Sequence, residues 1–284
     1  MKTADYAAPA PKGQRPAAGR GRFTAPATHD AKACPRFVGL ILLLPSPRRK
    51  NLTMRFLDDY IAAQQSPRRS PAPEGAIARP DRATLEAHLA RRRYGRFTLT
   101  EAIRPSWQLD VVPQAGYRLD TYVDPRTGSR LPALVASVSS EDLFETFLRL
   151  LDPLGDTCDV VLETSHEGDG GPGRGEHRGE FTREGMERLV LESVLWDFED
   201  LLLNDGCTGI AIMHPEEPIE VQLDEHKLLV VYAPNRRPFE RILEEQGIAR
   251  NDRMRFISQG EHLHTSHTRF ARLFDEMTAS FGAA

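Results

Sequence analysis

The chain has 284 residues, of which 40% are hydrophobic and 27% are charged, and its formal net charge is −4. These values are typical of a globular protein that folds without a metal or disulfide staple. The three cysteines, Cys34, Cys158 and Cys207, are too few and too scattered for a disulfide framework, which indicates a reducing, cytoplasmic compartment. No apolar run approaches the ~18 residues that a membrane helix needs, so a membrane protein is not expected.

The charge changes sign along the chain. Residues 1–53 contain ten Lys or Arg residues and two acidic residues, a net of +8, whereas residues 54–284 contain 27 basic and 39 acidic residues, a net of −12. Lys227 is the only lysine after residue 53. A nucleic-acid-binding protein needs a basic face for the phosphates. The acidic body therefore argues against nucleic acid and favours a protein partner or a small ligand.

Residues 1–53 are rich in Ala, Pro, Gly and Arg, and this composition predicts a disordered head. Two hypotheses explain it. Either the head is a genuine basic arm, or it is a mis-called extension of a bacterial protein whose translation begins at Met54. The second hypothesis rests on Arg48-Arg49, which can be encoded by AGGAGG, a bacterial ribosome-binding sequence, four codons before Met54.

The rest of the chain divides into two parts. Residues 54–80 predict a short helix over about 55–64 and then a linker, because four prolines interrupt both helix and strand. Residues 81–284 predict one globular domain, with its firmest core at 130–284. Asp81 is a good N-cap for a first helix that Gly95 would end.

Alternating and β-branched residues predict strands in most of the remaining segments. We expect strands at 97–99, 107–112, 117–123, 134–138, 159–164, 209–213, 219–223, 228–232 and 254–258. Helical periodicity predicts helices after Ser139, over about 183–204, between Pro238 and Gly247, and from Phe270 to Phe281. Ser139 and Asp142 resemble a capping box.

These elements predict an α+β fold, with α/β as the alternative. We expect a mixed sheet of five or more strands with helices packed on at least one face. Residues 219–232 form an antiparallel hairpin that turns at 224–227, so a purely parallel sheet is excluded. Residues 228–232 are continuously apolar, which predicts a central strand buried on both faces.

The best candidate site lies in residues 261–267. His262 and His264 project from the same side of an extended segment, and His267 lies at the mouth of the last helix. Three imidazoles with Glu261 or Asp275 would suit zinc or a similar ion. The alternative interpretation is an exposed polar loop in which Thr265 or Ser266 caps the helix.

Other candidate sites have simpler explanations. Residues 168–173 match GxGxxG formally, but no helix follows directly, so we expect a surface loop and no nucleotide cofactor. Asp197, Glu199, Asp200 and Asp205 predict a solvated polar face. Cys158 and Cys207 predict core residues, because no activating base is near them in the sequence.

Neither a catalytic motif nor a known family is evident in the sequence. The favoured hypothesis is a non-enzymatic module that binds a protein or a small ligand. The alternative is a metal-dependent, hydrolytic enzyme that uses His262, His264 and His267. A structural subunit is a third hypothesis.

Overall fold

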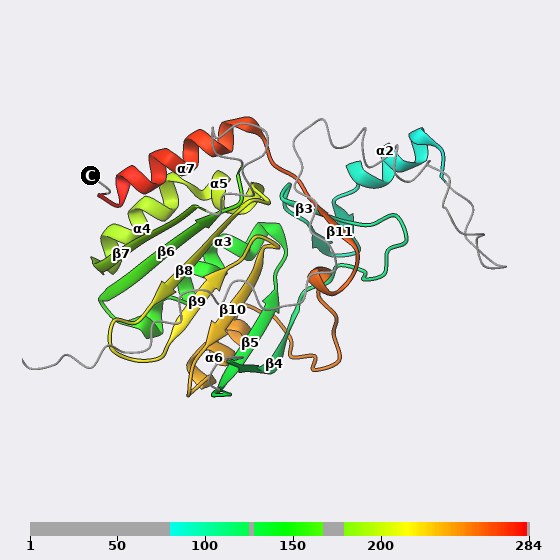
Figure 1. The fold of residues 1–284 in the computed structure, drawn as a ribbon. Coiled ribbons are helices and arrows are strands. Elements are labelled where there is room, and N and C mark those ends of the chain that lie inside the picture. The colour runs from blue at the N-terminus through cyan, green and yellow to red at the C-terminus, as the bar shows by residue number, and fades with distance from the viewer. Residues whose placement is uncertain (1–79, 125–127, 167–178, 283–284) are drawn as a thin grey trace, which may run out of the picture. The chain divides into compact units, whose positions relative to one another are not determined.

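The central feature of the fold is a seven-stranded sheet (Figure 1). The computed structural model describes residues 80–124, 128–166 and 179–282, all within one compact unit. The predictions for residues 1–53, for the helix and linker of 54–79 and for the loop at 168–173 lie outside the described residues.

Every pair of neighbouring strands in this sheet is antiparallel. The spatial order is β4-β5-β10-β9-β8-β6-β7. The strands are β4 (Gly116–Val123), β5 (Arg130–Ser137), β6 (Thr157–Thr164), β7 (Gly179–Glu187), β8 (Thr208–Met213), β9 (Glu220–Leu223) and β10 (Leu228–Tyr232). The one parallel pairing in the described part of the chain is an isolated bridge between Tyr117 and Arg250.

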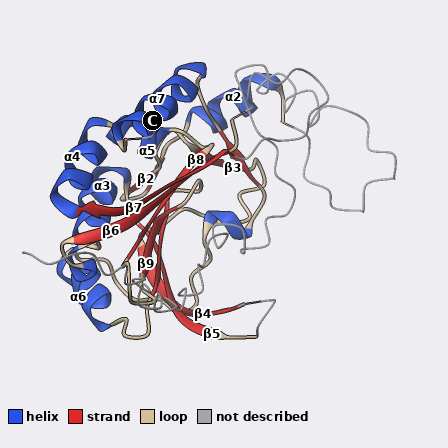
Figure 2. Cartoon of the chain, turned by 60° about the vertical axis from the view of Figure 1, so that its left-hand side comes forward, coloured by secondary structure: helices blue, strands red, loops and turns tan. Residues whose placement is uncertain are grey.

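Helices cover one face of the sheet, as Figure 2 shows from the side. They are α3 (Ser140–Arg149), α4 (Arg188–Asp197), α5 (Glu199–Asn204), α6 (Arg237–Glu245) and α7 (Thr268–Ser280). Pro238 lies in the first turn of α6, and Gly247 follows the helix with φ 73°, as predicted. The expected α+β class, with five or more strands and helices on at least one face, is confirmed. The sheet is antiparallel throughout, where a mixed sheet was expected.

Two small ribbons accompany the main sheet. In the first, β1 (Arg93–Tyr94) and β2 (Phe97–Thr98) form a hairpin around Gly95, whose φ is 64°. In the second, β3 (Ile103–Pro105) pairs with β11 (His262–His264), near α2 (Arg82–Ala90) in Figure 1. Asp81 caps α2 by accepting a hydrogen bond from the Thr84 amide, as predicted. The helix ends before Gly95, because Gly95 turns the hairpin instead.

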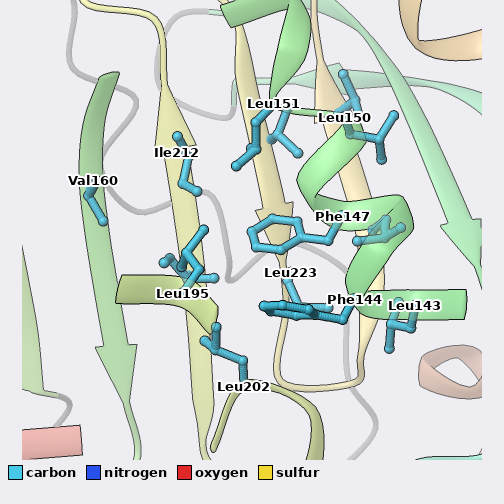
Figure 3. Packing of buried hydrophobic residues seen from close by; sticks show 14 of the residues in the cluster. Leu143, Phe144, Phe147, Leu150, Leu151, Val160, Leu195, Leu202, Ile212 and Leu223 are labelled. Carbon is cyan, nitrogen blue, oxygen red and sulfur yellow. The ribbon is translucent and has the colours of Figure 1, made fainter. Parts of the chain in front are cut away.

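The main core lies between the sheet and the helices, and Figure 3 shows part of it. Phe144, Phe147 and Leu151 of α3 and its C-terminal extension pack toward strand residues such as Ile212 and Leu223. On the opposite face of the sheet, Met254 and Phe256 cover β5 and β10. Strand β10 is therefore buried on both faces, as its continuous apolar sequence predicted.

The prediction of one long helix over 183–204 is wrong. The first residues of this segment form a strand, and the rest forms two helices instead of one. Residues 179–187 form β7, because the open edge of β6 offers hydrogen-bond partners to this backbone. Gly185, with φ 66°, is also incompatible with a continuous helix. Phe198 leaves helical geometry and separates α4 from α5.

Three further local predictions are wrong. Residues 107–112 are not a strand, since Leu109 has a φ of 51°. Residues 254–258 bury every side chain except that of Arg255 and find no strand partner, and Ile257–Gln259 form a 3-10 turn. Ser139 precedes α3, but its hydroxyl accepts from the Thr98 amide and donates to Glu141, so the capping box with Asp142 does not form.

None of the helices within the described ranges combines the length and the apolar character that crossing a bilayer requires.

The core predicts a clear mutational contrast. Phe147→Ala should lower the free energy of unfolding by about 3–5 kcal/mol, because the side chain is fully buried and its removal leaves a cavity. Val112→Ala, at a side chain that is 55% exposed, should change it by less than about 0.5 kcal/mol. Urea denaturation of both variants measures the difference, and equal midpoints would contradict the packing described above.

Strand β9 also buries polar side chains, although its alternating sequence predicted a half-exposed strand. Glu220 is 6% exposed and Gln222 is 2% exposed. Burial raises the pKa of Glu220 from its ordinary 4.5 to about 7, opposed by a hydrogen bond from Gln222 and supported by the negative charge of Glu163. Glu220 is thus a buried carboxyl group that holds its proton more tightly in the folded state than in the unfolded state.

This shift predicts a pH-dependent stability. The raised pKa favours the folded state at low pH, and the stabilisation is lost as the pH rises from about 4.5 through about 7. Glu220→Gln, which stays neutral, should therefore be more stable than the parent protein at pH 8 by up to about 3 kcal/mol, and should differ little at pH 4.5. Urea denaturation at both pH values checks this, with the exposed Glu217→Gln as control.

Candidate functional site

The structure brings His262 and His264 together with a third histidine, His226. In β11, His262 lies opposite Pro105 and His264 lies opposite Ile103, so the two imidazoles share one side of the ribbon. His226 belongs to the turn between β9 and β10. The potential ligand atoms of the three residues lie within 4.8 Å of one another. Their ring centroids are 4.8–5.1 Å apart. We call His226, His262 and His264 the histidine cluster.

His267, which was expected in this group, is not part of it. It is the N-cap residue of α7, and its ring lies 6.0 Å from that of Phe270, measured between centroids. The chain turns into the helix at this point and takes the side chain with it. Neither Glu261 nor Asp275 belongs to the group formed by the three histidines.

Each imidazole of the cluster is oriented through its Nδ1 atom. Nδ1 of His264 lies 2.7 Å from the carbonyl oxygen of Gly206, and Nδ1 of His262 lies 2.8 Å from that of Gly260. Nδ1 of His226 lies 3.0 Å from a carboxylate oxygen of Asp224. Since carbonyl and carboxylate oxygens only accept hydrogen bonds, each Nδ1 carries the proton. In its neutral form, each ring therefore presents a lone pair on Nε2, the atom that commonly binds metals.

His264 is held in the neutral form. Burial lowers its pKa well below the ordinary value, and the neighbouring His226 and His262 act in the same direction. Its Nε2 atom is buried and has no hydrogen-bond partner in the described part of the chain. A buried acceptor without a partner is costly, whereas a metal ion would use the same lone pair.

The turn that carries His226 is held by Asp224. One carboxylate oxygen of Asp224 accepts hydrogen bonds from the amides of His226 and Leu228, and the other faces the His226 ring. Lys227, the last residue of the turn at 224–227, has a φ of 60°. This left-handed conformation is normal for that position of a hairpin but usually occupied by Gly or Asn, so a lysine here indicates a specific requirement for its side chain.

The Lys227 side chain points into the protein. It is 5% exposed, and Nζ donates a hydrogen bond of 2.8 Å to the carbonyl oxygen of Thr208. Burial lowers the pKa of Lys227, and the negative charges of Asp205, Asp224 and Glu225 oppose this shift. The lysine therefore connects the His226 turn to the start of β8.

A second group of His166, Asp205 and Cys207 also offers ligand atoms within 4.8 Å. Here the acid is already satisfied, because Asp205 accepts hydrogen bonds from His166, Thr208 and the Cys207 amide. Burial acts to raise the pKa of Asp205, but these hydrogen bonds lower it overall. Burial raises the pKa of the Cys207 thiol to about 11, so the thiol stays protonated. The group is therefore a structural hydrogen-bond network around Asp205. Cys207 is a core residue, as predicted.

The carboxylates expected to share one solvated face are separated. Asp205 is fully buried, whereas Asp200 is at the surface and forms an ion pair of 2.8 Å with Arg269. Asp197 is exposed and Glu199 is partly exposed. The prediction of a polar face is therefore wrong for Asp205, because the chain turns inward after α5.

Gly206 links the two groups of polar residues. Its amide donates to the carbonyl oxygen of Thr265, and its own carbonyl accepts from His264. A Cβ atom at this position would overlap the carbonyl oxygen of Ala102 and lie 2.8 Å from that of Thr265. Both obstacles are backbone atoms, so only glycine permits this close approach.

The comparisons with known proteins yield no relative. No family model matches the chain, no curated protein matches it, and no solved structure matches it. The functional argument therefore depends on the residues of the site.

The close approach at Gly206 predicts a strong effect of one methyl group. Gly206→Ala should destabilise the protein by about 2–4 kcal/mol and displace His264, because the neighbouring backbone cannot move away cheaply. Gly209→Ala is the matched control, since its Cβ would have no neighbour closer than 3.6 Å. Urea denaturation and the histidine signals in NMR spectra measure both effects. Similar behaviour of the two variants would contradict the contact.

Proposed function

We propose that this protein binds a divalent transition-metal ion, zinc foremost, through His226, His262 and His264. The observation that carries the proposal is the orientation of three imidazoles whose Nδ1 atoms are all engaged by acceptors. In metal sites, a histidine ligand usually donates its second ring proton to a carboxylate or a carbonyl group in this way. The bound ion is then the small ligand of a binding protein.

The donor set favours particular metals. Imidazole nitrogen suits zinc, copper, nickel and cobalt, whereas magnesium and calcium prefer oxygen ligands. Tetrahedral zinc, with Zn–N bonds of about 2.0–2.1 Å, holds its nitrogen ligands about 3.4 Å apart. The ligand atoms of the cluster lie within 4.8 Å of one another, so small side-chain rotations would close them around an ion.

The formal charge around the cluster also supports a divalent cation. Asp205, Asp224 and Glu225 are buried carboxylates, and Lys227 is the buried cation that interacts with all three. Their formal charges sum to −2. The net negative charge of these groups would attract a divalent cation bound close to them.

A second candidate function is a metal-dependent hydrolytic enzyme. Three protein ligands leave one tetrahedral position open, which is characteristic of catalytic zinc sites. In such a site, the ion lowers the pKa of a bound water molecule and generates a nucleophile near neutral pH. Ester hydrolysis that is lost on chelation and restored by zinc would favour this candidate over binding alone.

A cytoplasmic location is part of the proposal. Cys158 and Cys207 are free, buried thiols, which suits a reducing compartment. A small ligand or a protein partner remains favoured over nucleic acid, because the chain after residue 53 has a net charge of −12.

Metal analysis tests the proposed site. The purified protein should bind one equivalent of zinc, and His226→Ala and His264→Ala should each abolish stoichiometric binding. Asp224→Asn should weaken it about 10–100-fold, because the variant loses the carboxylate that orients His226. Isothermal titration with zinc measures these affinities.

His267→Ala is the matched control, since this histidine is outside the cluster. It should bind zinc like the parent protein. Loss of binding in His267→Ala but not in His226→Ala would overturn the assignment in favour of the set predicted from the sequence. Zinc should also raise the melting temperature of the parent protein, because the ion binds the folded state, where the ligands converge.

A further inference from the structure

A small pocket adjoins the histidine cluster. It is lined by residues of the β2–β3 region, by the end of β5, by residues 255–257 and by the His226 turn, with His226 and Lys227 in its wall. Ile103, which lies opposite His264 in the β3–β11 ribbon, also lines it. The pocket and the cluster thus share His226, whereas His262 and His264 do not line the pocket.

The pocket is small and has both polar and apolar walls. Its volume of about 20 Å³ is close to what one or two water molecules occupy. Thr98 and Ser137 contribute polar groups, whereas Ile103, Val138 and Phe256 contribute apolar surface. Among carboxylates, formate is nearest to this size, whereas a bulky organic substrate is far larger.

The ionisable residues of the pocket are all basic. His226, Lys227 and Arg255 line it, and within the described residues no Asp or Glu does. Lys227 already donates to Thr208, so Arg255 is the cation that would favour an anionic ligand in the pocket. Arg255 is exposed, and its guanidinium group donates to the backbone carbonyl oxygens of Asp110 and Gln259. This arrangement contrasts with the acidic composition of the chain after residue 53.

We infer that the pocket admits a small carboxylate or carbonate anion to the open coordination position of the ion held by His226, His262 and His264. The inference rests on the proposed metal site and specifies its second ligand. Imidazoles that bind through Nε2 bring no negative charge to the ion, so its open position can accept an anionic ligand. Arg255 raises the local concentration of that anion at the pocket wall.

Cobalt(II) is a suitable probe, because it accepts the same imidazole ligands and its visible spectrum responds to a change of coordination. Formate, bicarbonate and the bulkier trimethylacetate are titrated separately into the cobalt-loaded protein at constant ionic strength. We expect formate and bicarbonate to change the spectrum with saturation, and trimethylacetate to bind at least about tenfold more weakly because the pocket excludes it.

Two variants test the role of the pocket wall. Arg255→Gln should weaken the binding of formate by about threefold to tenfold without changing cobalt affinity. Arg253→Gln is the matched control, because this exposed arginine lies two residues away and does not line the pocket. Equal affinities of the two variants for formate would contradict the role of Arg255.

Different results would overturn the anion inference and the proposed metal site. A normal cobalt spectrum that none of the anions changes would overturn the anion inference and leave the metal site intact. A spectrum that trimethylacetate changes as readily as formate would overturn the size limit set by the pocket. Absence of cobalt binding would overturn the proposed function, and the anion inference with it.

Discussion

The arrangement at one end of the seven-stranded sheet follows from a single constraint: a polar group removed from water needs a partner. Asp224 accepts hydrogen bonds from backbone amides of the turn between β9 and β10, and it orients the His226 ring. Lys227 reaches Thr208, and Asp205 holds His166 and Thr208. The histidine cluster is the place where this network leaves a ring nitrogen, Nε2 of His264, unsatisfied by the described residues. This unsatisfied lone pair is thus a consequence of how the surrounding groups are satisfied.

Much of the fold could be predicted from local patterns. The α2 N-cap, the β9–β10 hairpin, the buried β10 and the last helix all depend on residues close together in sequence. The failures required information from distant residues. Residues 179–187 became a strand because β6 had an unpaired edge, and residues 254–256 stayed irregular because they pack across the face of β5 and β10. Periodicity describes which side chains are buried, but it does not say where the backbone finds its hydrogen bonds.

The site was half predictable for the same reason. The alternation of His262 and His264 indicated that both rings lie on one side, and they do. His226 was missed because Asp-Glu-His-Lys between two strands is typical of an exposed turn. One signal could have suggested otherwise: the only lysine after residue 53 follows His226 directly, in a turn that lacks glycine and asparagine. His267 was included because it is near in sequence, whereas the start of α7 removes it from the cluster.

The burial of Lys227 has a consequence for the rest of the molecule. Since no other lysine follows residue 53, the positive charges that the folded part presents to solvent near neutral pH come chiefly from arginine. Guanidinium groups keep their protons in alkali and are not targets of lysine acetyltransferases. Neither lysine acetylation nor moderate alkalinity would therefore remove the positive charges that arginine gives to this domain.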